Sequence, residues 1–156
     1  MKKFILIGHN LQTSLSIREA LEINGILIEE FLCLQTAREI RELFAPITEL
    51  KNVDRPRELI ESVQAVNPIV VITSRIIFND LGDPMNLDGY LGILVKKWAF
   101  KGDIIAATTS SYGNSALMDA GAKRRVDNKF VDCHNPPELS SDEIIEGLIP
   151  LLKPAA

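Results

Sequence analysis

Side chains with hydroxyl and nitrogen groups follow the apolar segments of this sequence. The run PIVVITS ends in Thr73 and Ser74, and the opening run ends in Gly8 and His9. A serine served by a histidine can act as a nucleophile, but no third carboxylate is evident to orient the imidazole. A hydroxyl at a strand end is more often bonded to backbone groups, so we expect no hydrolase and no other enzyme.

The elements that must position these residues alternate between strand and helix. Short apolar runs predict five strands, and runs with helical spacing and capping signals predict the segments between them. Crossovers of this length favour parallel pairing, so the predicted fold is a doubly wound five-stranded parallel sheet, a three-layer αβα architecture. The expected strands are Phe4 to Ile7, Ile26 to Leu34, Pro68 to Thr73, Asp103 to Ala107 and Arg125 to Asp127.

The carboxyl edge of such a sheet is where open α/β folds place their ligand sites. Residues that follow different strands therefore meet there, although they lie far apart in the sequence. The residues expected to converge are Gly8, His9, Thr73, Ser74, Thr108 and Lys129.

Length and composition indicate one soluble domain that spans residues 1–156. The chain has 156 residues, of which 46% are hydrophobic, and its net charge of −4 gives no attraction for nucleic acid. The opening MKKFILIG predicts a strand rather than a signal peptide, and no apolar run reaches the length of a membrane span. Cys33 and Cys133 lack metal-type spacing, so we expect free thiols and a cytoplasmic location.

Several segments resemble the receiver domain of two-component response regulators. They are PIVVITS, then MNLDGYLGILVKKW, then IIAATTSS, then DAGAKRRVDNK before a final capped helix. The resemblance covers nearly the whole chain and depends on the order and spacing of the segments and on the Asp88-Gly89 pair. It implies a flavodoxin-like fold and a role in signal transduction.

The resemblance also implies a role for each strand end. In that family two carboxylates end the first strand, a phosphate-accepting aspartate ends the third, a Ser or Thr ends the fourth, and a lysine follows the fifth. An aromatic switch residue on the fifth strand falls at Arg125 here. The other positions fall, in that order, on Gly8 with His9, on Ser74 after Thr73, on Thr108 or Thr109, and on Lys129 or Asn128.

Every carboxylate of the implied site is therefore replaced. Mg²⁺ prefers hard anionic oxygen ligands, and an acyl phosphate forms only on a carboxylate. Gly8 has no side chain, and His9 is a poor magnesium ligand. We expect a degenerate phosphoacceptor pocket with no metal and no cofactor, neutral to positive in charge and able to hold an anion.

The segment from Arg75 to Leu87 is about twice as long as the resemblance implies. Asp80 and Pro84 imitate the spacing between the family's acceptor and a proline, so Asp80 is an alternative phosphoacceptor. A cation held by Asp80, Asp83 and Asp88 is another reading, although acidic residues in a loop are usually only solvated. The loop also carries an apolar cluster, Ile76, Ile77 and Phe78, which is expected to form a contact patch if it is exposed and to cover the degenerate pocket if it is not.

The sequence thus predicts a stand-alone pseudo-receiver that signals through protein contact without aspartyl phosphorylation. One alternative is a phosphorylatable response regulator using Asp80, and another is a small-molecule or anion-binding α/β domain. The expected partners are signalling proteins, either a histidine kinase or a downstream target, and a homodimer stays open. The expected contact residues are Lys123, Arg124, Arg125, Ile76, Ile77 and Phe78.

Overall fold

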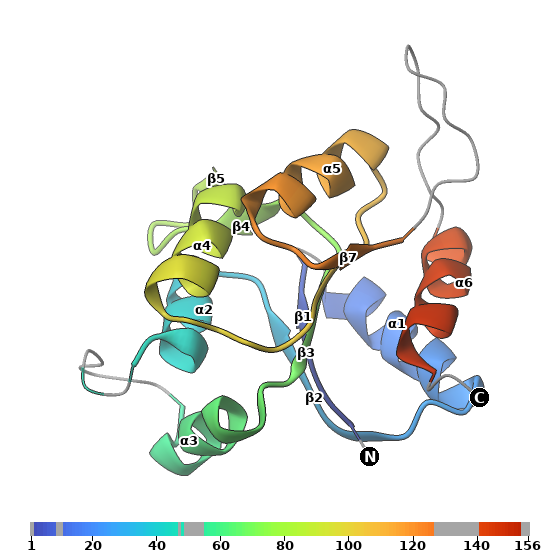
Figure 1. Ribbon diagram of the computed structural model, residues 1–156, viewed down its shortest axis with the longest axis horizontal. Coiled ribbons are helices and arrows are strands. Elements are labelled where there is room, and N and C mark those ends of the chain that lie inside the picture. Colours follow the sequence, from blue (N-terminus) through green and yellow to red (C-terminus); the bar gives the residue numbers. More distant parts are fainter. Residues whose placement is uncertain (1, 9–10, 47, 49–54, 127–140, 154–156) are drawn as a thin grey trace.

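The computed structural model describes residues 2–8, 11–46, 48, 55–126 and 141–153. Its main sheet has five strands in the order β2-β1-β3-β6-β7, and all neighbouring pairs are parallel. The predicted doubly wound, flavodoxin-like sheet is therefore confirmed, with β3 in the middle between β1 and β6 (Figure 1). The strands are β1 (Lys2–Ile7), β2 (Ile28–Leu34), β3 (Ile69–Ile72), β6 (Ile104–Ala106) and β7 (Arg124–Arg125).

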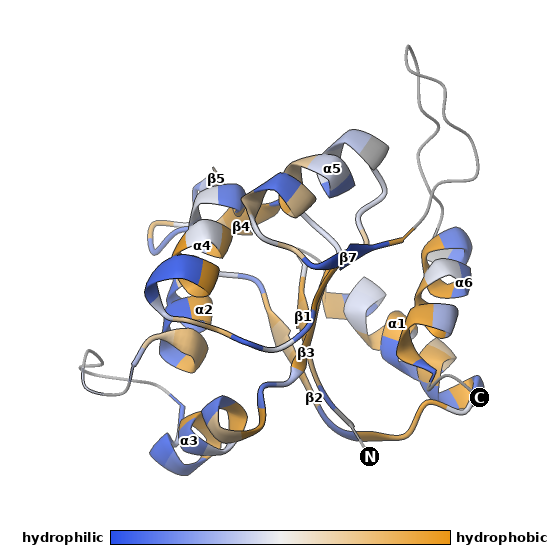
Figure 2. Ribbon diagram, viewed as in Figure 1, coloured by the Kyte–Doolittle hydropathy of each residue, from blue (hydrophilic) through white to orange (hydrophobic). Residues whose placement is uncertain are grey.

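Successive residues of each strand point to opposite faces of the sheet, and most of them are apolar. Both faces are therefore apolar, and helices cover both. In β1, Phe4 and Leu6 pack into one core with helices α1 and α6, whereas Ile5 and Ile7 pack into the other core. Figure 2 shows the central strands coloured mainly as hydrophobic between these helical layers. The first face is covered by α1 (Leu11–Ile23) and α6 (Ser141–Leu152), and the second by α2 (Ala37–Phe44), α3 (Arg57–Val66), α4 (Asp88–Gly92) and α5 (Ser111–Ala120).

Two helices differ from the prediction at their ends. The helical spacing of Tyr90, Ile93, Leu94 and Trp98 predicts a helix from Tyr90 to Trp98. The helix begins earlier, at Asp88, and its second half is a π-helical turn, η2 (Ile93–Lys97). Helix α5 begins at Ser111 rather than near Ala116, because the Oγ of Ser110 caps it by accepting a 3.0 Å hydrogen bond from the Gly113 N–H. None of the described helices has both the length and the apolar character that a membrane span requires.

The long segment after β3 is an antiparallel hairpin rather than the expected loop. Its strands are β4 (Ile76–Phe78) and β5 (Pro84–Asn86). The side chain of Asn79 organises the turn, because its Oδ1 accepts hydrogen bonds from the N–H groups of Leu81 and Asp83, both at 2.9 Å. The Phe78 N–H donates to the Gln35 carbonyl at 3.0 Å, so the hairpin is joined to the end of β2.

Candidate functional site

Strands β1, β3 and β6 end side by side at the carboxyl edge of the sheet. The Thr73 N–H donates to the Ile7 carbonyl at 2.9 Å, and the Ala107 N–H donates to the Ile72 carbonyl at 2.8 Å. These bonds align the three strand ends, so the structure brings together the four described residues of the predicted pocket, Gly8, Thr73, Ser74 and Thr108. His9 and Lys129, and with them Asn128, lie outside the described residues.

The space above Gly8 is occupied by Thr73. A Cβ built on Gly8 would lie closer to the Oγ1 of Thr73 than real non-bonded atoms approach, and 3.5 Å from the Oγ of Ser14. The Thr73 hydroxyl itself donates to the Ile7 carbonyl at 3.3 Å. While Thr73 keeps this rotamer, residue 8 has no room for any side chain, including a carboxylate.

The hydroxyl of Ser74 is used by the backbone of the hairpin. Ser74 is 6% exposed, and its Oγ donates to the Ile76 carbonyl at 3.1 Å and accepts from the Ile76 N–H at 3.0 Å. This local turn directs the chain from the end of β3 into β4. Ser74 is therefore a turn residue at the position where the resemblance places a phosphoacceptor.

Thr108 is held by Asn114, a residue of α5 that is fully buried. The Oδ1 of Asn114 accepts hydrogen bonds of 2.8 Å from both the N–H and the hydroxyl of Thr108, and its Nδ2 donates to the Thr108 carbonyl at 3.3 Å. Sequence reasoning placed Thr108 correctly but did not identify Asn114. Asn114 lies before the helix expected near Ala116, so its amide side chain, six residues after Thr108, was the only sequence signal.

Arg75 and Asp88 close the base of the hairpin. The guanidinium donates from Nε to Oδ1 at 3.3 Å and from Nη2 to Oδ2 at 2.8 Å, a two-point pair in which both side chains are about one-third exposed. The hydrogen bond to Asp88 raises the pKa of Arg75 above its ordinary value. The pair neutralises the charge of Arg75 beside the candidate pocket.

The donor groups at this edge do not fit Mg²⁺. Gly8 offers no ligand atom, the Ser74 hydroxyl is bonded to Ile76, and Asp88 is paired with Arg75. The cation site considered for Asp80, Asp83 and Asp88 is not formed, since within the described ranges no three His, Cys, Asp or Glu side chains are grouped to hold a metal ion.

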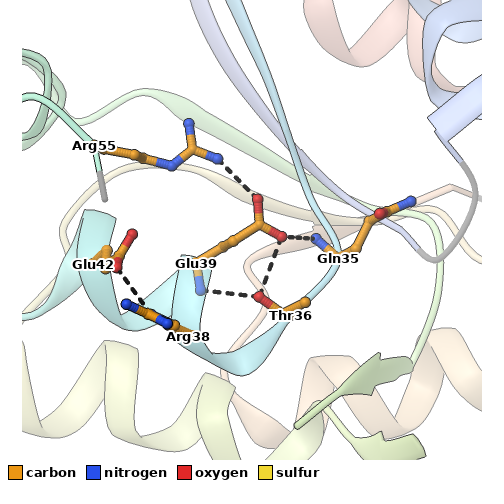
Figure 3. A network of polar contacts seen from close by, with 6 residues as sticks. All are labelled: Gln35, Thr36, Arg38, Glu39, Glu42 and Arg55. Carbon is orange, nitrogen blue, oxygen red and sulfur yellow. Dashed lines mark hydrogen bonds and ion pairs between the residues drawn. The ribbon is translucent and has the colours of Figure 1, made fainter. Parts of the chain in front are cut away.

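A second polar network fixes the end of β2 beside this edge (Figure 3). Thr36 caps α2 by accepting from the Glu39 N–H at 3.1 Å, and Glu39 in return accepts from the Thr36 hydroxyl and the Gln35 N–H. Arg55, just before α3, donates to Glu39 at 2.9 Å. Figure 3 also shows Arg38 reaching Glu42. These contacts position α2 and α3 relative to the strand end that receives the hairpin.

The three basic residues near β7 do not share one surface, which corrects the predicted contact. Arg124 pairs with Asp103 and donates to the Leu151 carbonyl at 2.7 Å, so it serves α6. Arg125 instead donates to the exposed hydroxyl of Ser115 on α5, at 2.7 Å. Neighbouring strand residues point to opposite faces, and this alternation separates the two arginines. Lys123 is exposed and donates to the Lys101 carbonyl at 3.0 Å.

The apolar cluster of the hairpin is also divided. Ile77 is completely buried in the core that contains α2 and α4, whereas Ile76 is 45% exposed and Phe78 is half-buried. Ile77 is therefore a core residue and cannot contact a partner as predicted. Ile76 keeps that role, and Leu81 in the turn is 86% exposed.

Asp80, the alternative acceptor, is exposed in the hairpin turn, away from the end of β3. It borders a small pocket of about 110 Å³ between the hairpin, α2 and α4, whose other lining residues are Ala37, Arg38, Arg41, Asn79 and Tyr90. These neighbours include two arginines and no second carboxylate, so the pocket does not supply the anionic ligands that a magnesium ion requires.

Comparison with known proteins identifies the fold. No known family model matches the sequence, and no curated protein matches it either. Among solved structures, the chain is similar to the Mn²⁺-bound form of the response regulator Rcp1, with a TM-score of 0.61 at 13% identity, covering 100% of this chain and 98% of that one. It is also similar to the phosphorylated cyanobacterial phytochrome response regulator RcpA, with a TM-score of 0.59 at 12% identity, covering 96% and 90%. The chain therefore has the fold of these response regulators.

Proposed function

We propose that this chain is a pseudo-receiver, which signals through protein contact, performs no enzymatic reaction and accepts no phosphate in its own pocket. The observation that carries the proposal is the pair of strand ends at Gly8 and Ser74. Thr73 fills the space above Gly8, and the Ser74 hydroxyl is bonded within the turn that starts the hairpin. Gly8 and Ser74 are two of the three positions that the receiver resemblance assigns to carboxylates, and neither offers a side-chain oxygen that is free to bind a metal ion or accept phosphate.

Phosphoryl transfer is unfavourable at such an edge for two physical reasons. The transferred group carries charge that Mg²⁺ normally neutralises, and that contribution amounts to several kcal/mol of transition-state stabilisation. The acceptor must also be an anionic carboxylate to form an acyl phosphate, whereas Ser74 has a neutral hydroxyl that already has both a donor and an acceptor partner.

We propose that the output face, the surface formed by α5 and β7, keeps one arrangement and does not switch between two states. The resemblance implies a movable hydroxyl at Thr108 and an aromatic rotamer at Arg125. In this chain Thr108 has three hydrogen bonds to Asn114, and Arg125 is bonded to Ser115. A partner would therefore meet the same α5 and β7 surface at all times, so the amount of protein would set the signal.

The phosphorylation test uses acetyl phosphate with Mg²⁺, followed by Phos-tag electrophoresis and intact mass. We expect no phosphorylated band and no added phosphate mass on the wild-type chain. Asp80→Asn is the matched control, because Asp80 is exposed and its replacement leaves the core unchanged. A phosphorylated wild-type band that is absent in Asp80→Asn would contradict the proposal and identify the hairpin turn as the acceptor.

The contact test compares single variants on the exposed part of the hairpin and on β7. Ile76→Ser and Arg125→Glu should each weaken capture of a signalling partner, and the Arg125 effect should depend on salt because charge pairs at an interface are screened. Lys96→Glu, on the exposed end of η2, is the matched charge control. Equal capture by all variants would place the interface elsewhere and contradict this assignment.

A further inference from the structure

A pocket of about 220 Å³ lies at the amino edge of the sheet, opposite the strand ends described above. It is formed where the end of α2 and the middle of α3 meet the segment that joins η2 to β6. Figure 1 shows these elements on one side of the sheet. Its walls include Leu43, Phe44, Val63, Gln64, Trp98 and Phe100.

The indole of Trp98 is the chemically unusual wall of this pocket. Its Nε1 is inaccessible and, among the described buried side-chain nitrogen and oxygen atoms, it alone has no hydrogen-bond partner. Buried donors in folded proteins nearly always have partners, so an unpaired indole N–H marks a place where an acceptor belongs. Trp98 lines the pocket, and the hydrogen-bonding capacity of its covered indole N–H is unused in the present arrangement.

The backbone around the pocket is strained at Ala99 as well. In the described part of the chain, the non-glycine residues with positive φ are Asn67, at 48°, and Ala99, at 54°. Both line this pocket. Asparagine tolerates the left-handed region, but alanine rarely adopts it, and such residues are concentrated at binding sites. The π-helical turn η2, another feature common at functional sites, leads directly into Trp98.

The walls select a neutral ligand. None of the lining residues is charged. The Gln64 Nε2 donates to the Leu43 and Ala45 carbonyls at 3.3 and 2.7 Å, so the amide N–H groups are already used by the end of α2. Apart from Asn67 and Gln64, the lining side chains are aliphatic or aromatic, and the rings of Phe44 and Phe100 are in edge-to-face contact with their centroids 5.2 Å apart.

We propose that this pocket binds a small neutral molecule with an apolar body and one carbonyl-type acceptor, which pairs with Trp98 Nε1. The indole ring must rotate slightly to present its N–H to the ligand, because neighbouring atoms cover Nε1 in the present arrangement. Burial of the apolar body and satisfaction of the unpaired donor both favour binding. This site is independent of the proposed pseudo-receiver role, since it uses other residues at the opposite edge.

The test uses ¹⁵N-labelled full-length protein titrated with cyclohexanone, followed by the single indole Nε1–H resonance that one tryptophan gives. We expect a saturable downfield shift with a dissociation constant on the order of 1 mM, typical of a fragment this small. Methylenecyclohexane has the same shape without the oxygen, and it should bind about fivefold more weakly because it cannot accept the hydrogen bond.

Val63→Leu places a larger side chain in the pocket wall and should weaken cyclohexanone binding several-fold, whereas Ile60→Leu on the same helix should leave it unchanged. Nuclear Overhauser contacts between cyclohexanone and the methyl groups of Leu43 and Val63 give a second measurement that needs no variant. An indole resonance that does not move, equal binding of both probes, or contacts at other methyl groups would each overturn the proposal.

Discussion

The hydroxyl of Thr73 lies in the space that a side chain on Gly8 would occupy. This relationship joins the ends of the neighbouring strands β1 and β3, so the side chain tolerated at either position depends on the other residue. In a variant with Asp at positions 8, 9 and 74, the side chain of residue 8 would therefore have no room unless Thr73 is replaced as well. The two residues must be analysed together in any attempt to rebuild a metal site.

Gly8→Ala should destabilise the protein by about 1–3 kcal/mol, because the new methyl group overlaps Thr73 in a packed interior. In a Thr73→Ala background the same change should cost much less, since the overlapping oxygen is gone. The measurement is a double-mutant cycle by urea unfolding, with the midpoint compared at constant slope. Additive effects of the two changes would show that residue 8 has room beside Thr73.

Asn114→Ala should cost about 2–4 kcal/mol, because it leaves the buried N–H and carbonyl of Thr108 without their partners. Ser115→Ala, the next residue along α5, is exposed and should change stability by no more than about 0.5 kcal/mol. Thermal and urea unfolding of both variants provide the comparison. A tolerated Asn114→Ala would mean that Thr108 finds other partners easily.

Arg124→Ala and Arg125→Ala should have opposite profiles, because the two side chains serve different faces of β7. Loss of Arg124 removes the Asp103 pair and the bond to Leu151, and it should cost about 1 kcal/mol, allowing for solvent screening of a pair that is about one-third exposed. Arg125→Ala should leave stability nearly unchanged and weaken partner capture. Unfolding and capture experiments on the same two proteins separate the effects.

The thiol of Cys33 should lower the free energy of unfolding at alkaline pH. Burial raises the pKa of its thiol, and the hydrogen bond with Ser14 opposes that shift only in part. In the unfolded chain the thiol ionises at about pH 8.5, whereas in the folded protein it keeps its proton to higher pH. The unfolded state therefore loses its proton first, and the stability present below that pH falls as the pH rises.

Urea unfolding between about pH 7 and pH 10 measures this loss, and Cys33→Ala should reduce it. Both proteins are compared in a Cys133→Ser background, so that the second thiol does not contribute. Identical pH dependence with and without Cys33 would exclude a raised thiol pKa in the folded state.

The main sheet could be predicted because its strands are continuous apolar runs, a pattern that buried parallel strands share. PIVVITS and IIAATTSS could be recognised from the sequence alone as strands that end at one edge of the sheet. The division of residues 36–66 into two helices was also predictable, since Pro46 and the segment before Arg57 interrupt the helical pattern. The start of α5 was harder to predict, because its capping residue Ser110 lies in a run of hydroxyl side chains, each of which could cap a helix.

The site itself was only partly predictable. Residue types showed that the carboxylates are missing, but the partners of each remaining side chain depend on three-dimensional contacts. Asn114 reaches Thr108 because α5 begins at Ser111, earlier than expected. Arg124 and Arg125 contact different elements because neighbouring residues of a strand point to opposite faces. The hairpin was missed because its strands have three residues each, too few for a clear alternation of polar and apolar positions.

The attachment of the β4–β5 hairpin to the end of β2 has a consequence for the order of folding. The hairpin can close by itself within microseconds, because Asn79 organises a short turn. Its bond from Phe78 to Gln35 joins distant parts of the chain and forms only after β1, β2 and β3 have assembled. Changes at this junction should therefore speed unfolding and leave the refolding rate almost unaltered, as expected for a contact made after the transition state.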